Sequence, residues 1–232
     1  MFKIGITGNS GAGKNFICNH LQDKDEVPTY DVDIICKRLT NENVSLKEEI
    51  TNLFGTKSYL ITGEYNSKYI ANIIFNNSVM KKELEELIGY YLMEDYTNWI
   101  LLKKKEGNLL CFVNCAYFYE LNIDYMVDMM IGVHCLDTIR IERIIKRDNI
   151  SYDDVLLRFN NQMDQELKME KCHFVYDNST LEIDEKKLDK IYFQITKFAR
   201  ILNNQKIEHW KFIQGNCLWD QNVKSDKSFE MF

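Results

Sequence analysis

A glycine-rich loop directly after an apolar run constrains this chain more than any other sequence feature. Residues 2–7 have the pattern of a buried strand, the segment Gly8-Asn9-Ser10-Gly11-Ala12-Gly13-Lys14 follows, and a helical pattern begins at Lys14. Glycines allow positive φ angles and bring successive N–H groups close to phosphate oxygens. The following helix directs its positive dipole at the same anion, and Lys14 reaches the β- and γ-phosphates. The spacing predicts a phosphate-binding loop; the alternative is an ordinary strand–turn–helix junction.

The amino-acid composition makes this loop more informative. The chain has 10 glycines, 1 proline and six arginines among 232 residues, against 22 asparagines. Three of those glycines fall within six residues of the loop. Lysine and asparagine therefore carry little information in this chain, whereas each glycine, proline and arginine carries more than usual.

Composition also excludes several classes of protein. The formal net charge of −6 disfavours a general nucleic-acid-binding surface. No run of 18 apolar residues is present, and the N-terminal segment lacks a basic region followed by a cleavage site. Seven cysteines without a C-x-x-C pair are typical of reduced, buried thiols. We therefore expect a cytoplasmic protein, by default a monomer, with a small-molecule partner and no nucleic-acid or membrane partner.

Short apolar runs alternate with helical patterns along the chain. This alternation predicts a three-layer α/β domain with a parallel sheet, because near-continuous apolar strands are typical of sheets that helices cover on both faces. The expected strands are 2–7, 29–33, 109–116, 129–135 and 174–176. The expected helices are 14–22, 32–39, 45–54, 67–75, 78–105, 137–147, 151–171 and 185–203. Residues 40–105 contain no good strand and are expected to form a helical insertion.

Two carboxylates, Asp31 and Asp33, stand at the end of the second expected strand, after Pro28. The carboxyl ends of parallel strands form the ligand-binding edge of an α/β sheet. A carboxylate there can accept a proton from an attacking hydroxyl or hold Mg²⁺. Asp31 is a candidate metal ligand and Asp33 a candidate base; the alternative for Asp31 is that it caps the following helix.

The residue after the loop lysine is Asn15. A phosphate-binding loop usually has Ser or Thr there, whose hydroxyl binds Mg²⁺. An amide oxygen can also coordinate a hard cation, so Asn15 is a second candidate metal ligand, but its side chain is longer. Magnesium affinity and turnover are therefore the properties that this departure puts in question.

Four of the six arginines, at positions 140, 143, 147 and 158, fall within 19 residues. Because the chain otherwise uses lysine, this cluster indicates planar, multi-donor recognition rather than charge alone. Arginine-rich helices on both sides of a connection are typical of a lid that closes over a transferring phosphoryl group. The alternative is a solvated helix face paired with Glu142, Asp148, Asp153 and Asp154, which explains one or two of the four. Arg147 and Arg158 are the strongest catalytic candidates, with Arg143 beside them.

Taken together, residues 2–200 resemble the dephospho-CoA kinase family. The loop IGITGNSGAGK, the segment VPTYDVD, the motif LFG at 53–55 and the segment TGEYNSKYIANIIF at 62–75 resemble family segments in the same order. AYFYE at 116–120 keeps the family's glutamate as Glu120, and RIIKRD, RFNNQM and VYDNS resemble its lid and last-strand motifs. The departures are Asn15, Ser67 for an arginine, Gly89-Tyr90 for a His-Pro pair, and Ala116 for a proline.

The resemblance implies a P-loop kinase fold with a parallel five-stranded sheet, a helical insertion and a lid. The kinase domain is then 1–204, with a core of 1–39 and 106–204, an acceptor-binding insertion of 40–105, a lid of about 138–165, and a tail of 205–232 with no assigned role. ATP and Mg²⁺ are the implied cofactors. The implied nucleotide-binding residues are Gly8, Asn9, Ser10, Gly11, Ala12, Gly13, Lys14, Asn15 and Asn178.

The implied reaction is phosphoryl transfer to the 3′-hydroxyl of dephospho-CoA. Asp33 would be the base, and Lys14, Arg147, Arg143 and Arg158 would neutralise the developing charge. Two alternatives stay open. A nucleoside monophosphate kinase, of phage type for example, uses the same lid and sheet. A nucleotide-binding protein without catalysis would explain Asn15, Ser67 and Gly89-Tyr90.

Overall fold

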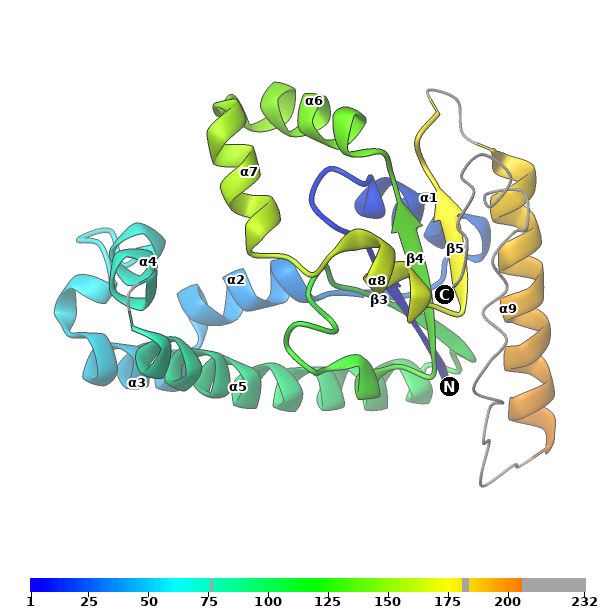
Figure 1. Cartoon of the computed structure of the whole chain (residues 1–232). Coiled ribbons are helices and arrows are strands. Elements are labelled where there is room, and N and C mark those ends of the chain that lie inside the picture. Colours follow the sequence, from blue (N-terminus) through cyan, green and yellow to red (C-terminus); the bar gives the residue numbers. More distant parts are fainter. Residues whose placement is uncertain (76, 181–183, 206–232) are drawn as a thin grey trace. The chain divides into compact units, whose positions relative to one another are not determined.

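The computed structural model describes residues 1–75, 77–180 and 184–205 (Figure 1). The expected tail, with Trp210 and Trp219, lies outside these residues apart from its first position. The chain divides into two compact units, which we call the core unit, Met1–Thr29 with the described chain from Gly107 onward, and the helical unit, Tyr30–Glu106.

The expected five-stranded sheet is confirmed. Its strands are β1 (Phe2–Thr7), β2 (Thr29–Asp31), β3 (Leu110–Asn114), β4 (Met129–His134) and β5 (Phe174–Asp177), in the order β2-β3-β1-β4-β5. The pairings of β1 with β3, β1 with β4, and β4 with β5 are all parallel. β1 is the central strand, so the loop that follows it emerges in the middle of the sheet's carboxyl edge.

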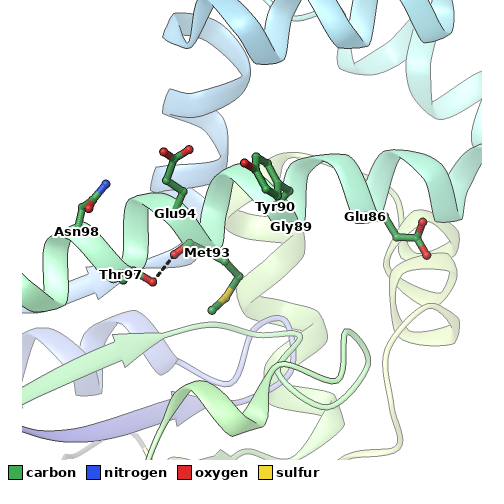
Figure 2. Close-up of a pocket in the computed structure, with 7 residues that line it drawn as sticks. All are labelled: Glu86, Gly89, Tyr90, Met93, Glu94, Thr97 and Asn98. Carbon is green, nitrogen blue, oxygen red and sulfur yellow. Dashed lines mark hydrogen bonds between the residues drawn. The ribbon is translucent and has the colours of Figure 1, made fainter.

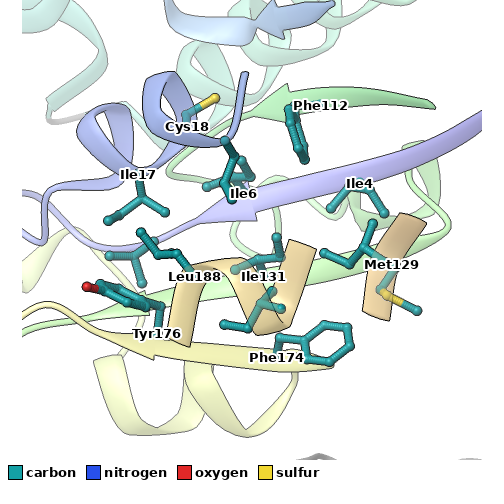
Figure 3. Close-up of a cluster of buried hydrophobic side chains, with 14 of the residues drawn as sticks. Ile4, Ile6, Ile17, Cys18, Phe112, Met129, Ile131, Phe174, Tyr176 and Leu188 are labelled. Carbon is teal, nitrogen blue, oxygen red and sulfur yellow. The ribbon is translucent and has the colours of Figure 1, made fainter. Parts of the chain in front are cut away.

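Alternate residues of the core-unit strands form one apolar face, as period-two geometry requires. Helices α1 (Lys14–Asp25) and α9 (Glu185–Gln205) supply the apolar side chains that cover this face. Figure 3 shows Ile17 and Cys18 of α1 and Leu188 of α9 packed among residues such as Ile6 and Ile131. This core fixes the start of α1, and with it the end of the loop.

The opposite face of the core-unit sheet is covered by the short helix α8 (Gln165–Glu170), which packs on β4. Gly132 makes that close approach possible, because a Cβ there would lie 2.6 Å from the Met169 sulfur and 2.9 Å from the Cys172 sulfur. Together the helices on both faces give the expected three layers.

Each of the remaining helices belongs to one of the two units. α6 (Asp137–Asp148) and α7 (Tyr152–Asn160) belong to the core unit and pack on each other (Figure 1). The helical unit contains α2 (Val32–Glu42), α3 (Val44–Phe54), α4 (Ser67–Phe75) and α5 (Ser78–Lys105). Two short 3₁₀ turns, η1 (Thr56–Ser58) and η2 (Asp124–Met126), complete the elements. Within the described residues, we find no helix that combines the length and the hydropathy needed to span a membrane.

Two predicted boundaries were wrong. The second strand ends at Asp31 rather than residue 33, because the Asp31 side chain accepts the Ile34 N–H and starts α2 at Val32. The helix expected over 151–171 is two helices, α7 and α8, because Asp164 accepts the Leu167 N–H and begins a new helix. The other expected elements are observed with ends shifted by a few residues.

Candidate functional site

The loop between β1 and α1 has the backbone geometry of an anion-binding turn. Gly11 and Gly13 have φ angles of +81° and +89°, a region that residues with a Cβ rarely adopt. A Cβ at Gly13 would lie 2.2 Å from Nδ2 of Asn178, the residue after β5. That same Nδ2 donates to the Ala12 carbonyl at 2.8 Å. Asn178, one of the predicted nucleotide-binding residues, therefore holds the loop from the carboxyl end of β5.

Lys14 is almost completely buried at the start of α1 and is held by two side-chain amides. Its Nζ donates to Oδ1 of Asn114 at 2.7 Å and to Oδ1 of Asn15 at 3.0 Å. The Asn114 amide nitrogen also donates to Asn15 Oδ1, at 3.1 Å. These contacts aim the ammonium group along the carboxyl edge of β3 and β1, where an anion on the loop would meet it.

Asn114 was missed by the sequence analysis. It ends the apolar run of β3, and the signal for it is a polar residue at the carboxyl end of a buried strand. In a chain with 22 asparagines that signal carries little weight by itself. Only the pairing of β3 with β1 brings Asn114 to Lys14.

The four clustered arginines divide into two pairs. Arg140 and Arg143 contact the loop backbone: Nε of Arg140 donates to the Ser10 carbonyl at 2.9 Å, and Nη1 of Arg143 to the Gly11 carbonyl at 3.4 Å. Arg147 and Arg158 both pair with Asp148 and are substantially exposed. Their hydrogen bonds hold the pKa of the Asp148 carboxyl well below its usual range. The two arginines ranked highest from the sequence thus form the solvated ion pairs that were the alternative, and the loop contacts come from the other two.

In the helical unit, Asp31 and Asp33 gather at the start of α2. Asp31 caps the helix through the Ile34 N–H, as its alternative role predicted, and Asp33 is exposed in the first turn. Burial, together with the negative charges of Asp33 and Asp31, raises the pKa of the Cys36 thiol to about 11. The start of α2 is therefore locally negative, although the described residues include no cluster of three or more side chains that could hold a metal ion.

Tyr30 anchors the segment that carries these carboxylates. Its hydroxyl donates to Asp95 of α5 at 2.8 Å, and Asp95 also pairs with Arg38 of α2 at 2.5 Å. The Tyr30 ring is fully buried and lies 5.1 Å from the Tyr96 ring centroid and 5.3 Å from that of Trp99. The end of β2 and the start of α2 are thereby fixed on α5.

A cavity of about 610 Å³ lies along one side of α5 (Figure 2). Gly89 and Tyr90, which replace the His-Pro pair of the resembled family, line it together with Met93. The Thr97 hydroxyl donates back to the Met93 carbonyl at 2.7 Å, so this polar group is satisfied within the helix. The cavity wall therefore combines an exposed aromatic ring, a flexible thioether and the carboxylates Glu86 and Glu94.

His134 at the end of β4 gives the core unit a pH-dependent contact. Burial lowers its pKa, but the Asp177 and Glu166 carboxylates, at 3.4 and 3.1 Å from the ring nitrogens, outweigh burial and raise it. Stability from a raised histidine pKa is present below about pH 6.5 and is lost as the pH rises through the folded-state value. Urea unfolding of wild type and His134→Gln should show a difference in the free energy of unfolding that is largest near pH 6 and shrinks toward about pH 9. A difference that grows with pH would contradict this assignment.

A fully buried lysine connects α8 to the segment after β3. Lys168 Nζ donates to Glu120 Oε1 at 2.7 Å and to the Ala116 carbonyl at 2.9 Å, and burial lowers the pKa of Lys168 despite the Glu120 charge. Lys168→Met should lower the free energy of unfolding by about 3 kcal/mol, because it leaves the half-buried Glu120 carboxylate without its cation and, among the described residues, with only the Met163 N–H as a hydrogen-bond donor. Chemical denaturation measures this, with Lys171→Met as the exposed control. In the double variant with Glu120→Gln we expect recovery of part of the loss; an equal or larger loss would contradict the pairing.

The strand order and the glycine-rich loop after the central strand define the class: an α/β protein with the P-loop kinase fold. The dephospho-CoA kinase family model matches residues 2–184. The chain belongs to the dephospho-CoA kinase family.

Relatives and solved structures agree with this assignment. A dephospho-CoA kinase of Rickettsia typhi is 30% identical over 206 residues, covering 88% of this chain and 100% of the relative. One of Listeria innocua is 27% identical over 208 residues, covering 87% and 98%. The solved structure of the Campylobacter jejuni dephospho-CoA kinase has a TM-score of 0.62 and 23% identity, covering 84% of this chain and 98% of that one. That structural likeness supports the fold.

Proposed function

We propose that this protein transfers the γ-phosphoryl group of ATP to the 3′-hydroxyl of dephospho-CoA, forming coenzyme A and ADP. Family membership supports the reaction, and the observation that carries it on this chain is the arrangement of the loop. Lys14 is buried and held by two amides, and the Ser10, Gly11 and Ala12 carbonyls are held by Arg140, Arg143 and Asn178. The Ser10 and Ala12 N–H groups are engaged by Gln162 and by the Asn9 carbonyl. With the carbonyls held from outside, the other loop N–H groups would be the ones to meet phosphate oxygens.

The residues of the core unit would bind and stabilise the transferring group. ATP would lie on Gly8–Asn15, with Asn178 beside it. The charge that develops on the phosphoryl oxygens would be neutralised by Lys14 and by arginines of the proposed lid, residues 138–165. These arginines are Arg143, Arg147 and Arg158. Release of Arg147 or Arg158 from Asp148 is needed for either to reach the nucleotide, since both are now paired with it.

The helical unit would supply the base and the acceptor site. Asp33 would accept the proton of the 3′-hydroxyl while its oxygen forms a bond to the γ-phosphorus and the bond to the ADP oxygen breaks. Residues 40–105 would form the acceptor-binding insertion. The cavity on α5, with Gly89 and Tyr90, offers an apolar and aromatic wall for part of the acceptor.

Mg²⁺ is proposed as the second cofactor, because phosphoryl transfer from ATP usually uses it to neutralise phosphate charge. Asn15 does not fit as a direct ligand in this arrangement, since its Oδ1 already accepts hydrogen bonds from Lys14 and Asn114. Asp31 is the better candidate, as a hard carboxylate ligand at the start of α2.

A panel of acceptors tests the proposal. ADP release is measured with ATP and Mg²⁺ and, in separate wells, dephospho-CoA, dTMP, dGMP and the other nucleoside monophosphates. We expect turnover on dephospho-CoA alone. Turnover on a monophosphate instead would establish the alternative kinase. ATP binding by calorimetry without turnover on any acceptor would favour a nucleotide-binding protein that has lost catalysis.

A further inference from the structure

We propose that Arg140 is a positioning residue for ATP: it fixes Ser10 of the phosphate-binding loop and connects that loop to helix α7. The proposal rests on the proposed function insofar as ATP is the ligand of the loop. Arg140 was a weaker candidate than Arg147 and Arg158 on the basis of the sequence. Arg140 is not placed in contact with the reacting atoms.

The contacts of Arg140 use the planar fork of the guanidinium in three directions. Its Nε donates to the Ser10 carbonyl at 2.9 Å and its Nη1 to Asp137 Oδ1 at 2.6 Å. Its guanidinium carbon lies 4.0 Å from the centroid of the Phe159 ring in α7. The residue is only 2% exposed. Lysine cannot make these contacts at once, because it has a single charged point and no planar face.

The segment after α7 holds the same part of the loop from a second direction. The Ser10 N–H donates to Gln162 Oε1 at 2.9 Å, and Asn9 Nδ2 donates to the Met163 carbonyl at 2.8 Å. Both backbone polar groups of Ser10 are therefore engaged by side chains, the carbonyl by Arg140 and the N–H by Gln162. Because both groups are held, the orientation of the Ser10 backbone is fixed. That orientation determines where the N–H groups of the following loop residues, from Gly11 onward, point.

The polar atoms left over show that packing alone does not explain this cluster. Arg140 Nη2, Gln162 Nε2 and Asn9 Oδ1 are buried and have no hydrogen-bond partner within the described protein. All three residues line one cavity of about 380 Å³, which none of the residues Gly11–Asn15 lines. Unpaired buried polar atoms lower stability, so apolar side chains would fill a purely structural position better. Arg140 and Gln162 both bond to the backbone of Ser10, and Asn9, the residue before it, bonds to the Met163 carbonyl.

The consequence is a specific kinetic signature. Without Arg140, Ser10 loses one of its two attachments and α7 loses the cation stacked on Phe159. The loop must then be ordered by ATP itself, and the free-energy cost of that ordering reduces ATP affinity. Acceptor binding and the chemical step, which use other residues, are affected less.

The test compares Arg140→Met with Lys146→Met, a matched loss of one exposed positive charge on the same helix. Calorimetry gives the Kd of ATP, steady-state kinetics give kcat and both KM values, and thermal unfolding checks the fold. For Arg140→Met we expect the Kd and KM of ATP to rise about tenfold or more, with the KM of the acceptor within about twofold. Arg140→Lys should recover part of the ATP affinity, and Lys146→Met should match wild type.

Two results would overturn the proposal: a folded Arg140→Met protein that binds ATP within about twofold of wild type, or equal losses in Arg140→Met and Lys146→Met. If Arg140→Met does not fold, Phe159→Leu decides the matter, since it keeps the arginine and removes the stacked ring. A raised ATP Kd in Phe159→Leu supports the proposal and an unchanged Kd contradicts it. If the wild type binds ATP but leaves dephospho-CoA unphosphorylated, the function proposal fails while the Kd comparison still tests Arg140.

Discussion

Replacing Lys14 with methionine is expected to lower kcat by about a thousandfold or more, the largest effect of any single change in the chain. The ammonium group is the only side-chain cation among the described residues of the loop, Gly8–Lys14. Two amide oxygens already orient it, at 2.7 and 3.0 Å, so little reorganisation is needed when charge develops on the phosphate. Methionine has a similar length and no charge, which isolates the electrostatic contribution.

Lys186→Met, an exposed change on α9, is the control for Lys14→Met. Both variants should unfold near the wild-type temperature, because removing Lys14 leaves two amides that can bond to each other or to water. Rates are measured by ADP release at saturating ATP and acceptor. A Lys14→Met protein that keeps near wild-type turnover would contradict the assignment of the loop as the catalytic nucleotide site.

Asp33→Asn is expected to reduce kcat by about a hundredfold or more, the usual effect of losing a general base. Asn has nearly the same shape and cannot accept the hydroxyl proton. Because Asp33 is exposed in the first turn of α2 and does not cap it, stability should change little. Asp31, which does cap the helix, remains in place, so the variant tests the base without disturbing the start of α2.

Glu42→Gln, an exposed carboxylate at the other end of α2, serves as the control for Asp33→Asn. The pH profile adds a second readout, because loss of a catalytic base should remove the acidic limb of kcat. Equal kcat in Asp33→Asn and Glu42→Gln, with an unchanged profile, would transfer the role of base to another residue.

The sequence predicted the parts of the site that depend on local spacing. The loop, its lysine and the helix after it are contiguous, so their geometry follows from the order of residues 2–15. The apolar runs predicted the layers for the same reason, since a strand buried on both faces has few other solutions. Asn178 was predicted only through the motif of the resembled family, and the structure shows its contact with Ala12.

The rest depends on contacts between distant residues. Asn114 meets Lys14 only because β3 pairs with β1, and Gln162 meets Ser10 across 152 positions of sequence. The spacing of the arginines in the sequence does not predict their partners. Arg147 and Arg158 pair with Asp148. Arg140 and Arg143 donate hydrogen bonds to carbonyls of the loop. The break between α7 and α8 at residues 161–164 was not predicted. Asp164 caps α8 there, but the residues on both sides favour a helix, so the sequence pattern continues across the break.

The identity of the product tests the proposed reaction most directly. The protein is incubated with ATP, Mg²⁺ and dephospho-CoA, and the products are identified by mass spectrometry and phosphorus NMR. We expect one ADP for each coenzyme A, with the new phosphate on the 3′-oxygen, and no detectable product from Lys14→Met over the same incubation. Intact dephospho-CoA after incubation with a folded, ATP-binding protein would contradict the proposed reaction.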